Sequence, residues 1–376
     1  MVKCPRCFAE LPAVQAWMCT SGQCAPGQGA PPGVTGPVQK TERPDTGPRP
    51  AGSVTCEKCH CGTVEVCPVK SCRFVLPFGW RETPSTCVVM AGARNAGKSL
   101  YIAVLVKQLE QYGELVGIQV APATRASAKL YHSVYEEPLF AQRGMLVPTG
   151  SVQLADAYQR EPLVLEFAHR SSARHHLVIR DVAGEDLEAD SLDRDTVRVL
   201  ENADGVLFLF DPLSLRDVRD QLIGLVPLPD VWDPEKPRVV LSNILRLIEG
   251  RRPRLALAMS KFDVLQAMRS VDGGDLSRIM QNTGAAFARE PGWRGPYPEH
   301  DGRLLHEEIR SLLHWVGAGW LVTAMERLEI QQGIDQRFFA LSALGDAPAG
   351  RYLHDRGITP FRCLDPIRWM LTGRAL

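Results

Sequence analysis

The stretch Gly92-Ala-Arg-Asn-Ala-Gly97-Lys98-Ser99 constrains the fold more than any other part of the sequence. It matches the pattern GxxxxGK[ST], follows the apolar run 85–91 and leads into a segment with helical periodicity. Glycine lets the backbone wind tightly with its N–H groups inward, and the following helix directs its positive end at the same point. The pattern predicts a phosphate-binding loop with Lys98 as the catalytic cation and the Ser99 hydroxyl on Mg²⁺. The expected nucleotide contacts here are Gly92, Asn95, Gly97, Lys98, Ser99 and Leu100.

From about residue 83 to residue 376, short apolar runs alternate with amphipathic segments. This alternation is typical of an α/β fold, a doubly wound and mostly parallel sheet with helices on both faces. We expect a P-loop NTPase sheet of six strands and a helical insertion at about 264–335, in which a Gly-Ala-Gly sequence would allow a kink. The expected strands are 85–91, 162–168, 176–180, 204–210, 254–259 and 337–341, and the main expected helices are 98–111, 236–249 and 303–330.

Two short sequences indicate which base the site would hold. Asp263 follows the run 254–259, and a carboxylate can accept two parallel hydrogen bonds from the N1–H and exocyclic amine of guanine. Adenine has no such pair of donors. The Lys261 stem can lie along the base or ribose, and a backbone N–H at Ser342 or Ala343 can contact the guanine carbonyl. Since ligands of doubly wound sheets bind at the C-terminal ends of strands, these motifs predict GTP or GDP.

A DxxG sequence, Asp181 to Gly184, follows the expected strand 176–180. An aspartate at this place can hold Mg²⁺, usually through water. The Gly184 N–H can bind a γ-phosphate and let the next segment rearrange on hydrolysis. The motif therefore predicts a sensor of the third phosphate.

Together these motifs resemble those of the Ras-like, translation-factor-type (TRAFAC) GTPases over about residues 84–345. The sequences YEEPLF, DVAGED, LFLFDP and LDPIRWML are similar to the bacterial double-GTPase families, in which the domain often carries N-terminal zinc-ribbon elements. The resemblance implies binding of Mg²⁺-GTP, slow or regulated hydrolysis, and a role in bacterial conflict, defence or signalling systems.

The sequence departs from that family pattern at two places, and a phosphate-loop residue, Arg94, has two possible roles. Glu185 stands where a water-orienting glutamine is usual, so either turnover is slow or the side chain points away as a surface charge. The switch I threonine has no clear signature in 112–161. Thr149 is better placed than Thr124 as a catalytic Mg²⁺ ligand, the alternative being an ordinary loop residue. Arg94 either neutralises transition-state charge or faces solvent.

Cysteines dominate residues 1–80, which we expect to form a zinc-ribbon-like module. Two spacings repeat, CxxC and Cx4C, and short pairs of this kind place thiolates around a tetrahedral Zn²⁺. Either neighbouring pairs share a metal, or the pairs interleave, with Cys61 spare and His60 as a substitute ligand. Residues 25–53, rich in glycine and proline, are expected to be a disordered insertion. The interleaved sets would be Cys4/Cys7 with Cys67/Cys72, and Cys19/Cys24 with Cys56/Cys59.

The overall composition restricts location and partners. Lys and Arg number 43, as do Asp and Glu, so net charge gives no support for nucleic acid as a partner. No apolar run reaches the length of a spanning helix, and the N-terminus MVKCPRCFAELP lacks the apolar segment of a secretory signal. We therefore expect a cytoplasmic protein without a membrane span.

Two functions stay open at this point. One is a GTPase switch whose zinc module or 264–335 insertion reports the nucleotide state to a protein partner. The other is a non-hydrolysing, GTP-bound scaffold whose zinc ribbons bind protein or nucleic acid. Glu185 favours the scaffold, whereas the intact Lys98, Ser99 and Asp181 favour the switch. An ATP-specific enzyme is the third possibility.

Overall fold

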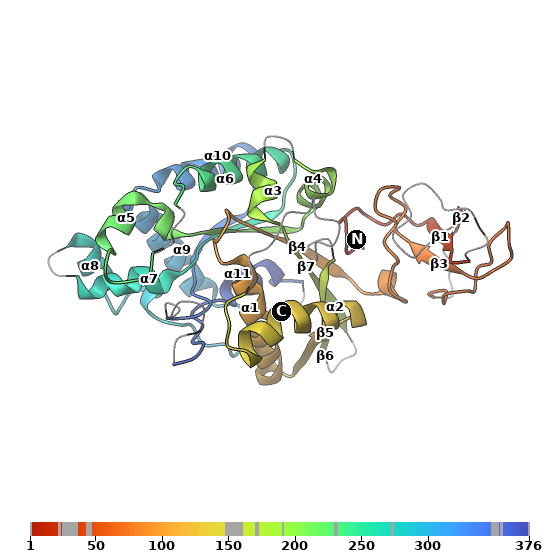
Figure 1. Ribbon diagram of the computed structural model, residues 1–376, viewed down its shortest axis with the longest axis horizontal. Helices are drawn as coiled ribbons and strands as arrows, with labels where there is room; N and C mark the ends of the chain where they lie inside the picture. The colour runs from red at the N-terminus through yellow and green to blue at the C-terminus, as the bar shows by residue number, and fades with distance from the viewer. Residues whose placement is uncertain are drawn as a thin grey trace.

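The protein consists of a small cysteine-rich unit at one end and a larger α/β unit (Figure 1). The expected α/β fold is confirmed. Among the residues described here, no helix is both long enough and apolar enough to cross a bilayer. This computed structural model describes residues 2–21, 24, 37–42, 47–146, 161–169, 173–189, 192–228, 232–271, 274–346, 353 and 356–374.

A seven-stranded sheet forms the centre of the larger unit, in the order β10-β9-β8-β4-β7-β6-β5. Neighbours from β10 to β7 run parallel, whereas β6 pairs antiparallel with both β7 and β5. β4 and β8 are buried almost throughout, as expected for parallel strands covered on both faces. The strands are β4 (Ser85–Ala91), β5 (Ile118–Pro122), β6 (Leu163–His169), β7 (Arg174–Asp181), β8 (Gly205–Phe210), β9 (Arg254–Met259) and β10 (Gln336–Ala340).

The strand β5 is one more than the six that the sequence predicted, so that count was wrong. It pairs with β6 from Ile118 opposite His169 to Pro122 opposite Leu165. β5 lies at the edge of the sheet, where proline is tolerated because one side of the strand makes no ladder. The sequence Ile-Gln-Val-Ala-Pro is too short and weakly apolar to stand out from a loop.

Helices cover both sides of the sheet. Figure 1 shows α3, α4, α6 and α10 along one side, with α1 and α11 along the other. The segment expected as one helix over 303–330 is two helices, because the chain turns at Gly317 with a φ of 80°. The helices are α1 (Lys98–Val116), α2 (Arg125–Leu130), a π-helix (Tyr131–Ala141), α3 (Gly184–Glu188), α4 (Arg194–Glu201), α5 (Arg216–Gln221), α6 (Lys236–Leu247), α7 (Phe262–Gln266), α8 (Asp275–Met280), α9 (Glu299–Trp315), α10 (Gly319–Gln332) and α11 (Asp365–Leu371), with short 3-10 turns at Trp80–Glu82, Pro212–Ser214, Ala267–Ser270 and Ala286–Ala288.

The cysteine-rich unit contains a three-stranded antiparallel sheet in the order β2-β1-β3, made by β1 (Gln15–Cys19), β2 (Val38–Thr41) and β3 (Thr63–Val66). β2 falls within 25–53, so the expectation of disorder was wrong for these four residues. They form a strand because Val38 packs against a small apolar cluster on β1 and β3. Residues 25–36 and 43–46 lie outside the described residues.

The cysteine-rich unit contacts the larger unit through specific polar and ring contacts. Lys3 Nζ lies 2.7 Å from Asp204 Oδ1, just before β8. The Trp80 indole donates to the Lys3 carbonyl at 2.8 Å and stacks on His176 of β7, with ring centroids 4.6 Å apart. Arg180 of β7 donates to the Arg6 carbonyl at 2.7 Å. These contacts join the first cysteines directly to the central sheet.

Candidate functional site

The phosphate loop has the winding that its glycines predicted. Gly92 has a φ of +148°, and a Cβ there would lie 2.5 Å from the Leu209 carbonyl oxygen. Asn95 and Gly97 also have positive φ values, the left-handed backbone found in anion-binding nests. Lys98 is buried, and its Nζ donates to the Gly92 and Ala93 carbonyls at 2.8 and 3.1 Å. Burial lowers the pKa of Lys98, while Asp181 and Glu188 oppose that shift.

Beside this loop, Ser99 and Asp181 place two oxygen atoms close together that could act as ligands of a metal cation. The Ser99 hydroxyl donates to Asp181 Oδ2 at 3.1 Å. The other oxygen, Oδ1, is buried and finds no hydrogen-bond donor among the described residues. Burial raises the pKa of Asp181 to about 6, against the opposing effects of Lys98 and the Ser99 hydrogen bond. A hydroxyl beside a buried carboxylate with an unused oxygen fits Mg²⁺, a cation that prefers such oxygen ligands. Thr149, the proposed third ligand, lies outside the described residues.

The DxxG turn packs directly on the phosphate loop. A Cβ at Gly184 would lie 2.4 Å from the Arg94 backbone nitrogen, so only glycine allows this approach. Glu185 Oε1 lies 2.8 Å from Arg94 Nη1, and both side chains are partly exposed. Both side chains thus lie at the surface, which agrees with the solvent-facing alternative for each, but as an ion pair with one another. Glu188 links α3 both to the phosphate loop and to α6. Its carboxylate accepts a hydrogen bond from the Arg94 N–H at 3.2 Å and forms an ion pair with Lys236 of α6 at 3.0 Å.

The opposite end of the site holds the residues predicted to recognise a base. Asp263 Oδ1 accepts a hydrogen bond of 2.5 Å from the Ser342 hydroxyl, and burial raises the pKa of this carboxyl. Lys261 has a φ of 48°, and its Nζ lies 2.5 Å from Asp211 Oδ2. This ion pair holds the Lys261 side chain, which lines the cavity described below. Asp211 was missed as a site residue, although the LFLFDP sequence contains it.

One cavity of about 390 Å³ joins the two ends, and Lys98 and Asp263 both line it. Its size suits a small-molecule site. The cavity also has an apolar wall that no sequence motif indicated, since these residues come from connecting segments without a recognisable pattern. The lining residues that had been predicted are Asn95, Gly97, Lys98, Ser99, Leu100, Gly184, Glu185, Lys261, Asp263, Ser342 and Ala343, and those of the apolar wall are Met145, Leu146, Leu213, Pro227 and Leu228.

The cysteines form two sets of four, in the interleaved pairing. Within each set the Sγ atoms all lie within 4.8 Å of one another. Tetrahedral zinc with Zn–S bonds of about 2.3 Å places its sulfurs about 3.8 Å apart. The measured Sγ–Sγ distances are compatible with that spacing: Cys4–Cys72 3.8 Å, Cys7–Cys67 3.6 Å, Cys19–Cys59 3.4 Å and Cys24–Cys56 3.8 Å. Each set could therefore hold a metal ion such as zinc, and Cys61 belongs to neither set.

The sheet order, the phosphate loop and the DxxG turn define the α/β unit as a P-loop GTPase domain. The family model for Double-GTPase 2 matches residues 87–292, and the chain belongs to this family. The resemblance seen in the motifs is thereby confirmed.

A relative from Mycolicibacterium smegmatis, described as a putative ESX-1 scaffolding and assembly protein, SaeC, is 44% identical over 384 residues. The alignment covers 99% of this chain and 99% of the relative. Solved structures give weaker likenesses. The Ski7 GTPase-like domain of S. cerevisiae bound to GTP has a TM-score of 0.31 at 12% identity, covering 69% of this chain and 43% of that one. A bacterial selenocysteine-specific elongation factor, EF-Sec, has a TM-score of 0.28 at 11% identity, covering 77% and 29%.

Proposed function

We propose that this protein is a molecular switch that binds Mg²⁺-GTP, hydrolyses it slowly in the cytoplasm and reports its state to a protein partner. The observation that carries the proposal is the single cavity lined by Lys98 at one end and Asp263 at the other. Binding of GTP requires a cation that contacts the phosphates and a carboxylate that accepts hydrogen bonds from the guanine edge. The relative's description as a putative ESX-1 scaffolding and assembly protein supports a protein partner within such an assembly.

Different residues of the site would bind the phosphates, hold Mg²⁺ and contact the γ-phosphate. The inward N–H groups of 92–99 and the Lys98 ammonium bind the β and γ phosphates, and the α1 N-terminus adds its dipole. Ser99 and Asp181 would hold Mg²⁺, which when bound neutralises charge on the phosphate oxygens. Gly184 offers its N–H to the γ-phosphate, and the apolar wall limits access of water.

A phosphate-release assay tests hydrolysis. Purified full-length protein with Mg²⁺-GTP should release phosphate over hours, and Lys98→Ala should release none, because phosphate binding loses its buried cation. We expect the Lys98→Ala protein to bind GTP at least about a hundredfold more weakly. Release no faster from the unchanged protein than from this variant would contradict the enzymatic part of the proposal.

Glu185 provides a prediction about rate. Its carboxylate brings negative charge toward the γ-phosphate and holds Arg94 at 2.8 Å. Glu185→Gln removes that charge, frees Arg94 for the phosphate and supplies an amide that can both accept and donate. Single-turnover hydrolysis is expected to accelerate by roughly tenfold. Glu307→Gln, which changes an exposed carboxylate on α9 that does not line the cavity, is the control and should leave the rate within about twofold. A slower Glu185→Gln protein would instead assign water activation to the carboxylate itself.

A GTP-bound scaffold without hydrolysis is the second candidate. The Arg94–Glu185 ion pair favours the scaffold, because each side chain that could act in catalysis is held by the other.

For the switch and for the scaffold alike, the cysteine-rich unit is a suitable surface for contacting a partner. Arg180, which contacts the Arg6 carbonyl, directly precedes the Mg²⁺ candidate Asp181, and Arg198 of α4 donates to Ser71 at 2.8 Å. Guanine nucleotide and protein are thus the proposed ligands, with the 264–335 insertion as the other candidate surface.

A further inference from the structure

The loop that would contact guanine is held by a segment close to the C-terminus. Ser342 and Phe361 form an antiparallel bridge, with N–H to carbonyl distances of 3.0 and 2.8 Å. The Cys363 thiol donates to the Ser342 carbonyl at 3.1 Å. The Ser342 hydroxyl in turn donates to Asp263 Oδ1 and accepts from the Gly345 N–H at 2.9 Å. Residues 361–363 therefore set where the hydroxyl that orients Asp263 lies.

The same segment contacts the other half of the base site. The Phe361 ring lies parallel to the Phe262 ring, with centroids 6.2 Å apart and planes 11° from each other. Phe262 directly precedes Asp263, and its N–H donates to the Leu341 carbonyl at 3.0 Å. Both loops of the base site, 260–263 and 341–345, thus depend on the position of the one short segment.

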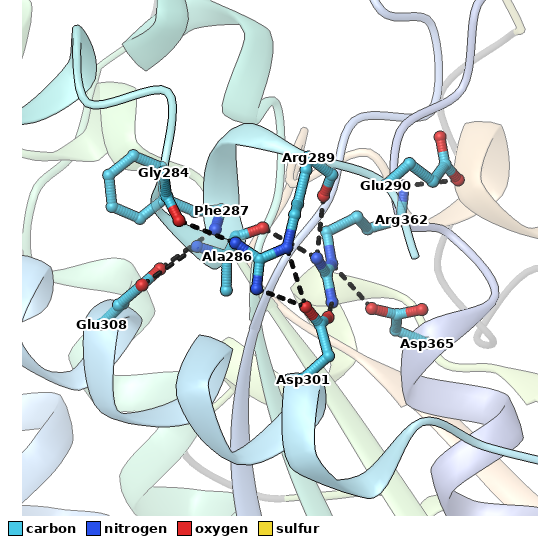
Figure 2. Close-up of polar contacts among 9 residues, drawn as sticks. All are labelled: Gly284, Ala286, Phe287, Arg289, Glu290, Asp301, Glu308, Arg362 and Asp365. Atoms are coloured by element: carbon cyan, nitrogen blue, oxygen red, sulfur yellow. Dashed lines mark hydrogen bonds and ion pairs between the residues drawn. The ribbon is translucent and has the colours of Figure 1, made fainter. Parts of the chain in front are cut away.

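Arg362, at the centre of that segment, is fully buried and has a φ of 51°. Its guanidinium lies among residues of the insertion, α9 and the start of α11, as Figure 2 shows. Nε donates to Asp365 at 2.7 Å and Nη2 to Asp301 at 2.5 Å. Nη1 donates at 2.8 Å to the carbonyls of both Ala286 and Arg289. The planar fork of arginine satisfies four acceptors at once, and two carboxylates balance its charge.

We propose that Arg362 is a positioning residue for guanine selection, acting through Ser342 on Asp263 without touching the nucleotide. The proposal rests on the proposed function, since it presumes guanine in the cavity. A carboxylate can accept two parallel hydrogen bonds only if it lies in the plane of the base. Anchoring residues 361–363 to the insertion fixes Ser342, and so fixes that plane. Lysine, a single point charge, cannot reach four separate acceptors and would leave the segment free to shift.

Arg362→Lys tests this through base discrimination. ITP differs from GTP only in lacking the exocyclic amine that Asp263 would bind, so the Kd ratio of ITP to GTP measures how well the carboxylate is placed. We expect a ratio of roughly ten or more in the unchanged full-length protein. In Arg362→Lys the ratio should fall below about three, because GTP loses two hydrogen bonds to the displaced carboxylate whereas ITP loses one. Equilibrium titration with Mg²⁺ gives both values.

Arg289→Lys is the matched control. The Arg289 side chain donates to Asp301 and to the Gly284 carbonyl, in the same network, but makes no hydrogen bond with residues 361–363 in the described structure. Its ITP-to-GTP ratio should equal that of the unchanged protein. If Arg362→Lys does not fold, the isosteric Asp365→Asn is measured instead, and its ratio should fall severalfold.

The outcomes separate the two proposals. An unchanged protein that binds ATP as well as GTP overturns the proposed function. An unchanged protein that prefers GTP, with Arg362→Lys less stable to heat but equal in its ITP-to-GTP ratio, overturns the positioning role and leaves Arg362 as a structural residue. If Arg289→Lys reduces the ITP-to-GTP ratio as much as Arg362→Lys does, the positioning role of Arg362 is also overturned.

Discussion

Asp263→Asn is expected to change the preferred nucleotide from GTP to XTP. The aspartate accepts two hydrogen bonds from guanine, whereas an asparagine amide donates to the 2-carbonyl of xanthine and accepts from its N1–H. Sites built around such hydrogen bonds reject analogues strongly, so the GTP affinity should fall by about two orders of magnitude while XTP binding becomes measurable. Competition titrations with GTP, XTP and ATP provide the measurement.

Two comparisons separate base recognition from folding in this experiment. Asp346 also lines the cavity, and Asp346→Asn should alter GTP affinity by less than about threefold without creating a preference for xanthine. Burial raises the pKa of Asp263, so removing this buried charge should not lower the melting temperature of the nucleotide-free protein. A variant that melts normally yet still prefers GTP would show that Asp263 does not recognise the base.

The elements that the sequence predicted correctly are those determined locally. A strand, a tight glycine turn and a helix follow one another within 85–116, so the phosphate loop needs no distant partner. The sequence singled out Asp181 and Asp263 because each comes at or just after the end of a buried strand, and Asp263 lines the cavity. Parallel pairing then brings these strand ends to one edge of the sheet, and the cavity at that edge follows.

Features that depend on contacts distant in the sequence could not be predicted. Arg362 contacts carbonyls 73 and 76 residues away, in segments without a motif. The Arg94–Glu185 pair depends on how closely Gly184 packs against the phosphate loop, a distance that sequence does not give. The apolar wall at Met145, Leu146 and Pro227 comes from connections whose paths over the site are set by tertiary packing alone.

The cysteine pairing shows how strand register settles what spacing leaves open. β1 and β3 pair antiparallel, with Cys19 opposite Thr63 at one end and Ala16 opposite Val66 at the other. The residues after β1 therefore lie beside those before β3, while Cys67 lies beside the residues before β1. Antiparallel pairing brings together Cys19, Cys24, Cys56 and Cys59 at one end and Cys4, Cys7, Cys67 and Cys72 at the other.

The two cysteine sets should differ sharply in what their loss does to nucleotide binding. Cys4, Cys7, Cys67 and Cys72, the inner set, belong to the main apolar core together with Trp80 and Cys87. Among the described residues, Cys19, Cys24, Cys56 and Cys59, the outer set, form a separate small cluster with Cys61. Cys67→Ser should therefore destabilise the GTPase domain by several kcal/mol, since structural zinc contributes about 10–16 kcal/mol of binding free energy in small domains. GTP binding should be lost with it.

Cys56→Ser is the matched substitution in the outer set, Cys19, Cys24, Cys56 and Cys59. It should also reduce zinc, measured by atomic emission, from two equivalents per chain to one, yet keep GTP affinity within about twofold and leave the main melting transition in place. The difference follows from packing, because only the inner set shares its core with β4 and the Trp80–His176 contact to β7. Equal loss of GTP binding in both variants would mean that the outer sulfurs also support the nucleotide domain. Two zinc equivalents in either variant would mean that its substituted cysteine is not needed to hold the metal.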